Sequence, residues 1–209
     1  MAPCVCGKEI GMKKHIKTVV LVVIMAALVI GYYYYLSNRN SDSGKQENTV
    51  AASGNSSAAE LVTLDIDNNY PESPRDVLKL YARITQAFYA SDTTDEQVEK
   101  LGMQARKLFD SELKGKQTDQ EYIEALKADV DNYRSLGRYV SDYKVDSSVN
   151  FEYKTIAGKS YAIGTVLYFI REGNSLNNAY HSYKMRKDDN GRWKILYWEL
   201  ADSNKMSDD

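Results

Sequence analysis

The feature that most constrains this chain is a run of twenty-one residues without a charge, residues 18–38. An α-helix rises about 1.5 Å per residue and the hydrocarbon core of a bilayer is about 30 Å thick, so about twenty apolar residues can cross it. Val, Leu, Ile and Ala dominate the first part of the run, and four tyrosines follow at residues 32–35, where aromatic rings favour the headgroup level. We therefore expect residues 18–38 to form a transmembrane helix in contact with the lipid bilayer.

The charges on the two sides of this run differ, and they set its expected orientation. Basic residues outnumber acids before the run, whereas the two signs are mixed after it. Because basic segments stay on the cytoplasmic side, we expect residues 1–17 to be a cytoplasmic tail of a single-pass membrane protein whose remainder is extracytoplasmic. A cleaved signal peptide has a similar layout. The tyrosines extend the run past Gly31, a poor cleavage position, and this favours an uncleaved signal anchor.

The two ends of this N-terminal region carry little specific chemistry. Cys4 and Cys6 have no second pair and no histidine cluster nearby, so we expect no metal site, no structural disulfide and no cofactor. Met12 opens a more usual start than Met1, and the choice between them stays open. Residues 39–72 are rich in Asn, Ser, Gly and Ala and predict a flexible linker. Within this linker, residues 61–66 form either a short strand or a peptide that docks on the following domain.

Residues 73–201 predict one α+β domain, followed by a tail of residues 202–209. Three helix starts carry a hydroxyl residue with an acid or amide three positions later. These capping residues are Ser73, Thr94 and Thr118. Apolar residues recur at helical spacing after each of them, which predicts three helices that end near residues 88, 109 and 137.

After residue 137 the apolar pattern changes from helical spacing to alternation, which is typical of antiparallel strands. We expect a long first strand over residues 139–153, half-exposed, with Tyr143, Val149 and Phe151 on one face. Three more strands follow, over residues 160–171, 178–187 and 193–200. The prediction is a four-stranded antiparallel meander, whose last hairpin contains an Asn-Gly turn.

This order of elements, the capped first helix and the Gly-Arg-Trp-Lys-Ile of residues 191–195 resemble the nuclear transport factor 2-like (SnoaL-like) superfamily. The resemblance implies a curved four-stranded sheet packed on three helices in a cone. Uncharacterised bacterial membrane-anchored proteins look similar as a whole. So does the bitopic assembly protein of type IV secretion systems, which has a cytoplasmic tail, one span and a cone-shaped domain outside.

The resemblance also indicates where a ligand would bind. In superfamily enzymes such as ketosteroid isomerase, an Asp or His in the cone acts as a base beside a Tyr donor. His181 is the one histidine after the apolar run, and Tyr183 shares its strand face. With Tyr81 and Tyr143 they are the candidate cone-lining residues. No acid stands at a spacing that would orient His181, and Asp142 and Asp146 are expected to be solvated, so we expect no catalytic residue.

Composition narrows the function further. The net charge is −2 at pH 7, and the acids are concentrated after the basic tail, so we expect no nucleic-acid partner. Seventeen tyrosines against four phenylalanines predict a partly polar core, a pocket or a contact surface. We expect a membrane-anchored, extracytoplasmic binding or assembly domain without enzymatic activity, for an unidentified small molecule or protein. The alternatives are a subunit of a secretion or conjugation machine and a small isomerase or hydrolase.

One feature of the strands predicts self-association. Residues 160–171 and 193–200 are apolar on both faces, although a sheet covered by helices on one side should be polar on the other. A homodimer through the outer sheet face would bury this apolar surface. Alternatively, residues 61–66 or the C-terminal tail would fold back and cover it.

Overall fold

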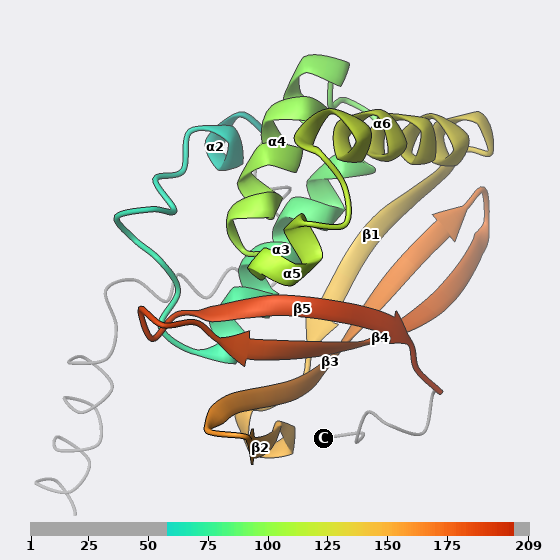
Figure 1. The fold of residues 1–209 in the computed structure, drawn as a ribbon. Helices are drawn as coiled ribbons and strands as arrows, with labels where there is room; N and C mark the ends of the chain where they lie inside the picture. Colours follow the sequence, from blue (N-terminus) through green and yellow to red (C-terminus); the bar gives the residue numbers. More distant parts are fainter. Residues whose placement is uncertain (1–57, 203–209) are drawn as a thin grey trace, which may run out of the picture. The chain divides into compact units, whose positions relative to one another are not determined.

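The structure, a computed structural model, describes residues 58–202, which belong to the compact unit Ala52–Asp209 (Figure 1). The predicted cytoplasmic tail and the predicted span at residues 18–38 fall outside the described residues. Within residues 58–202, no helix is long and apolar enough to cross a membrane. The expected fold class is wrong: in place of three helices and a four-stranded sheet, the described part contains five α-helices and a five-stranded antiparallel sheet, and it shows no transmembrane helix.

The five helices include the three with predicted capping residues. They are α2 Ala58–Val62, α3 Pro74–Phe88, α4 Asp95–Lys107, α5 Ser111–Lys114 and α6 Asp119–Ser135. The predicted caps are confirmed, because the side chains of Ser73, Thr94 and Thr118 each accept a hydrogen bond from the backbone N–H three residues later. These bonds satisfy backbone donors that the first helical turn leaves free.

The two additional helices are short and gave no periodic signal. In α2, Leu61 is buried in the same core as α3 and α4. The Gln104 side chain donates from Nε2 to the carbonyl oxygens of Val62 and Leu64, at 3.0 and 2.8 Å. Residues 58–72 therefore pack as part of the domain. In α5, the Asp110 carboxylate caps a single turn by accepting from the Glu112 N–H.

The sheet contains five antiparallel strands built around β3. They are β1 Arg138–Val145, β2 Glu152–Ile156, β3 Lys159–Glu172, β4 Ser175–Lys187 and β5 Trp193–Leu200. The order is β1-β3-β4-β5, and β2 also pairs with β3. Because β1 pairs with the later half of β3 and β2 with its beginning, they lie one after the other along the same edge.

The extra strand arises because the predicted first strand is broken in the middle. Asp146 is buried rather than solvated, and its carboxylate accepts from the Ser147 N–H and from Asn150 Nδ2. Such local side-chain bonds compete with strand pairing and favour a turn, here the 3₁₀ helix Ser148–Asn150. Val149 is 83% exposed as a result, which contradicts its predicted inward position. Phe151 packs instead against Gly164 of β3, where a side chain would collide with its ring.

The helices lie on one side of the sheet (Figure 1). We call the sheet face that packs against α3 the inner face. Strand register aligns Tyr143 with Tyr168, and Tyr183 with Trp198, across neighbouring strands of this face. The Tyr81 ring of α3 lies 5.7 Å from the Tyr183 ring, so the inner face and α3 share one core.

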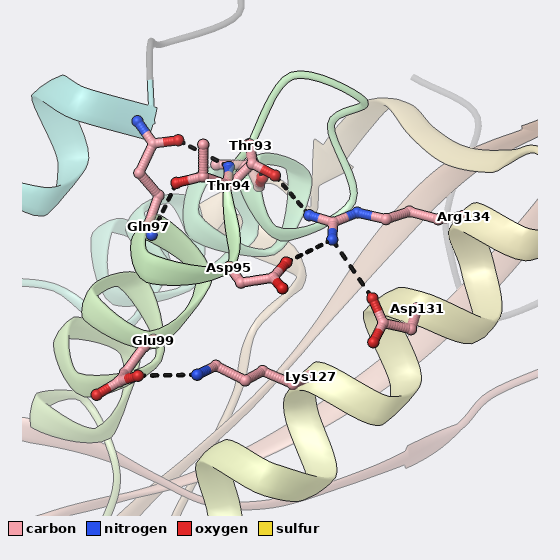
Figure 2. Close-up of polar contacts among 9 residues, drawn as sticks. Thr93, Thr94, Asp95, Gln97, Glu99, Lys127, Asp131 and Arg134 are labelled. Atoms are coloured by element: carbon pink, nitrogen blue, oxygen red, sulfur yellow. Dashed lines mark hydrogen bonds and ion pairs between the residues drawn. The ribbon is translucent and has the colours of Figure 1, made fainter.

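Helix α6 contacts the rest of the domain mainly through α4. Lys127 Nζ lies 2.8 Å from Glu99 Oε2, and Arg134 Nη1 lies 2.8 Å from Asp95 Oδ1. Figure 2 shows both ion pairs between the two helices. The two helices also approach closely at Gly102, where an added Cβ would stand 2.6 Å from Ile123 Cδ1. This arrangement positions one face of α6 toward the inner face of the sheet.

Candidate functional site

Two adjoining cavities lie between α3, α6 and the inner face of the sheet. Their volumes are about 380 and 250 Å³. Both are lined by Tyr81, Thr85, Tyr89, Asp129 and Trp198. Because they share these walls, we treat them as two lobes of one site, the tyrosine cavity. Another hollow of about 390 Å³, beside β1, is lined mainly by exposed polar side chains and is a surface depression.

The floor of the larger lobe is a cluster of buried hydroxyl groups. The Tyr168 and Tyr183 hydroxyl oxygens lie 2.9 Å apart. Burial raises the pKa of Tyr168 to about 12 and the pKa of Tyr183 well above its ordinary value. Burial likewise raises the pKa of Tyr81, and hydrogen bonding by Thr85 opposes that rise at both Tyr81 and Tyr168. These hydroxyls therefore stay protonated and act as neutral hydrogen-bonding groups.

A single carboxylate, that of Asp129 on α6, lines both lobes. Tyr89 donates its hydroxyl hydrogen to Asp129 Oδ2 in a short hydrogen bond. Burial, followed by this bond, raises the pKa of Tyr89. The Tyr89 ring also packs on the Tyr133 ring, with centroids 4.3 Å apart. Together these contacts fix the position of a negative charge beside aromatic rings.

His181 of β4 lies in the wall of the larger lobe. Its ring centroid is 5.3 Å from that of Tyr168 and 6.2 Å from that of Tyr183. Burial lowers the pKa of His181 below its ordinary value. The imidazole is therefore neutral at neutral pH and adds no charge to the cavity.

The smaller lobe contains a buried guanidinium, that of Arg106, whose charge is compensated. Its Nε lies 2.6 Å from Asp119 Oδ1, in an ion pair that lacks the geometry of a directed hydrogen bond. Its Nη2 donates to the carbonyl oxygens of Lys114 and Gln117. Its Cζ also lies 5.1 Å from the Tyr122 ring centroid. These partners make Arg106 a structural group that holds the α5–α6 connection.

The structure brings three of the four candidate residues together. Tyr81, His181 and Tyr183 line the larger lobe. Tyr143 is not among its lining residues; it is half-buried and packs against the core beside Tyr168. Ligand binding by these side chains stays a prediction. Among residues 58–202, no three side chains of the metal-binding types gather in one place.

Sequence reasoning missed three residues that line the cavity: Asp129, which carries its charge, and the solvent-exposed Trp198 and Leu200. Asp129 precedes Tyr133 by one helical turn, so a carboxylate within an aromatic helix face was the available signal. Trp198 and Leu200 also line the larger lobe, and they are 37% and 78% exposed. Their strand was predicted to be apolar on both faces, but that pattern does not show which side chains border a cavity.

The sequence comparison assigns a family but no chemistry. Residues 8–198 match the family described as a domain of unknown function, DUF6715. The chain belongs to this family. No curated protein matches it. The matched range takes in both the uncharged run at residues 18–38 and nearly all of the domain.

Proposed function

We propose that this DUF6715 protein is a membrane-attached extracytoplasmic binding protein whose domain takes a small organic molecule into the tyrosine cavity. The observation that carries the proposal is the cavity itself. Ligand sites are concave, mostly apolar and equipped with a few placed polar groups, with volumes of about 300–1,000 Å³. The two lobes of about 380 and 250 Å³, with aromatic walls and one carboxylate, match that description.

The polar groups of the cavity favour binding over catalysis. A general base works best with a pKa near the operating pH, and a nucleophile needs a neighbouring base. The pKa values of Tyr81, Tyr168 and Tyr183 are raised by burial, which makes them poor nucleophiles and poor bases. The pKa of His181 is lowered by burial alone, without a carboxylate partner that would orient the ring. These groups support recognition by hydrogen bonds.

The extracytoplasmic location rests on the sequence. The basic residues before residues 18–38 and the mixed charges after them favour a cytoplasmic N-terminus. Protease added to intact spheroplasts should therefore digest the domain and leave a short membrane-bound fragment. Full protection of the domain in spheroplasts, with digestion after lysis, would contradict this location.

The outer sheet face, opposite to the inner face, supports a homodimer as a second part of the proposal. It carries Ile163 and Phe169 of β3, Tyr180 of β4 and Tyr197 of β5, none of which is fully buried in one chain. Residues 61–66 pack toward α4 through Gln104 and so do not cover this face. Light scattering of the purified chain should show a dimer, and a monomer at every concentration would contradict it.

A pair of bulky substitutions on β4 tests the cavity directly. Ala179 lines the larger lobe, whereas its neighbour Asn178 is exposed and is aligned with Phe169 of the outer face. We expect Ala179→Trp to fill the lobe and Asn178→Trp to leave it open. Small organic compounds that raise the melting temperature of the wild-type chain should stabilise Asn178→Trp equally and should not stabilise Ala179→Trp. Equal stabilisation of both variants would place binding elsewhere and contradict the proposal.

A further inference from the structure

We infer that the ligand of the tyrosine cavity is an organic cation, a quaternary or N-alkylated ammonium group, with Asp129 as its counter-charge. The inference rests on the proposed function and names its ligand class. It is carried by two independent properties of the larger lobe: the aromatic rings that line it and its electrostatic balance.

Aromatic rings surround the larger lobe on both the helix side and the sheet side. The Tyr81 and Trp198 ring centroids lie 6.0 Å apart, and those of Tyr183 and Trp198 lie 6.1 Å apart. Tyr89 and Tyr133 form a second pair on the side of α6. Ring faces carry negative electrostatic potential and attract cations, most strongly when the cation is desolvated, and tryptophan is the best of these rings.

The formal charge of the larger lobe is negative. Its lining includes the Asp129 carboxylate and, among the described residues, no lysine or arginine. The hydroxyls are protonated and the His181 ring is neutral, as argued above. Arg106 is the one cation among the described lining residues of the two lobes, and its charge is balanced by Asp119 and two carbonyl oxygens. Arg138, whose charge acts on Tyr133 of the larger lobe, is paired with Glu172. The field inside the larger lobe therefore favours a positive ligand.

The other ligand classes fit this lobe less well. An anion would meet the exposed Asp129 carboxylate, and no lysine or arginine of the lobe lining would offset that repulsion. A neutral apolar ligand would cover the carboxylate and leave it without a charge partner. An alkylated ammonium pairs with the carboxylate, and because its carbon atoms donate no strong hydrogen bonds, it can rest on ring faces without losing hydrogen bonds.

Three compounds of one shape and different charge test the inference. The three compounds share nearly the same skeleton. Choline is positively charged, 3,3-dimethylbutan-1-ol is uncharged and 3,3-dimethylbutyrate is negatively charged. Binding to the full-length chain in a non-ionic detergent is followed by tryptophan fluorescence, since Trp198 lines the cavity. We expect choline to bind about tenfold or more tightly than the alcohol, and the carboxylate to bind most weakly.

Two substitutions on α6 separate the local charge from the overall charge. Asp129→Asn keeps an acceptor for the Tyr89 hydroxyl but removes the charge, and it should weaken choline binding about tenfold with little change for the alcohol. Asp131→Asn removes an equal charge two residues away, where Asp131 pairs with Arg134, and it should change neither affinity.

Each alternative outcome overturns the inference in a recognisable way. If the alcohol binds the wild-type chain as tightly as choline does, the cavity binds without charge selection and the proposed function stands while the cation inference falls. If Asp131→Asn weakens choline binding as much as Asp129→Asn does, the effect belongs to surface charge. If choline does not bind, the inference also falls, and the Ala179→Trp comparison still decides the proposed function.

Discussion

Two helices border the tyrosine cavity, α3 and α6, and they are held in place by different forces. Nine of the fifteen residues of α3 are buried, whereas only Ile123 and Val130 are buried among the seventeen of α6. Apolar burial stabilises by about 25 cal/mol per Å², so α3 is fixed by the core. The α6 helix depends more on exposed ion pairs with α4, which contribute little each. The comparison indicates that α3 forms a rigid wall of the tyrosine cavity and that α6 forms an adjustable one.

The largest expected effect is on the free energy of unfolding, when one buried isoleucine is truncated in α3 and another in α6. Ile84 of α3 is fully buried, and Ile84→Ala should lower the free energy of unfolding by about 2–5 kcal/mol, because the packed core cannot collapse around the missing atoms. Ile123→Ala in α6 should cost less, since α6 can shift to close the space. Urea denaturation measures both values, and an equal or larger cost at Ile123 would break the comparison.

The contact between α4 and α6 should show the next largest effect. Gly102→Leu places a branched side chain against Ile123 and Leu126, whose atoms would stand 2.6 and 2.9 Å from a Cβ. We expect a loss of about 1–3 kcal/mol from overpacking and weaker ligand binding, because α6 moves away from α4.

Gly102→Ala is the control for this substitution. Alanine favours the helix by about 1 kcal/mol over glycine, and the two nearest atoms are the ends of flexible side chains, so its net effect should be small. Calorimetry measures stability for both variants. Unchanged stability and binding in Gly102→Leu would show that α6 does not need this close approach.

The ion pairs of α6 should contribute less than its packing. Glu99→Gln removes the partner of Lys127 shown in Figure 2 and should lower the melting temperature only slightly at low salt, because exposed ion pairs contribute little. Because exposed pairs are screened, the difference from wild type should shrink at about 1 M salt. A larger loss of stability that does not depend on salt would mean that this ion pair holds α6 as strongly as core packing holds α3, and it would break the comparison.

The sheet wall opposite the helices should add a pH effect, which we expect to be the smallest because His181 is only half-buried. The pKa of His181 is lowered in the folded state. As the pH falls through about 6.5, the unfolded state therefore binds more protons than the folded state does. The free energy of unfolding should therefore be unaffected above that pH and should decrease below it. His181→Gln should remove this decrease in melting curves between pH 7.5 and 5.5, and an unchanged decrease would contradict the assignment.

Much of the helical layer could be predicted from the sequence, and the reason is local. The caps at Ser73, Thr94 and Thr118 involve residues three positions apart, so their chemistry is visible in the chain. The break at Asp146 could not be predicted from alternation, since the pattern of residues 139–153 suits an unbroken strand. Only the side-chain bonds of Asp146 and the packing of Phe151 on Gly164 explain it.

The candidate site was predicted in part for a similar reason. Alternation along β4 placed His181 and Tyr183 on one face, and both line the cavity. The same reasoning put Tyr143 in the site, because register alone does not show where α3 covers a strand. Asp129 was missed because the rotation of α6 is set by its contacts with α4, which lie far apart in the sequence.

Amide hydrogen exchange of the full-length chain tests the central claim most directly, because it measures α3 and α6 in the same sample. We predict that the amides of α6 exchange much faster than those of α3 in the free protein. Saturation with the tightest compound from the cavity screen should slow exchange in α6 and leave α3 unchanged. Equal protection of the two helices in the free protein, with no change in α6 on binding, would contradict the account.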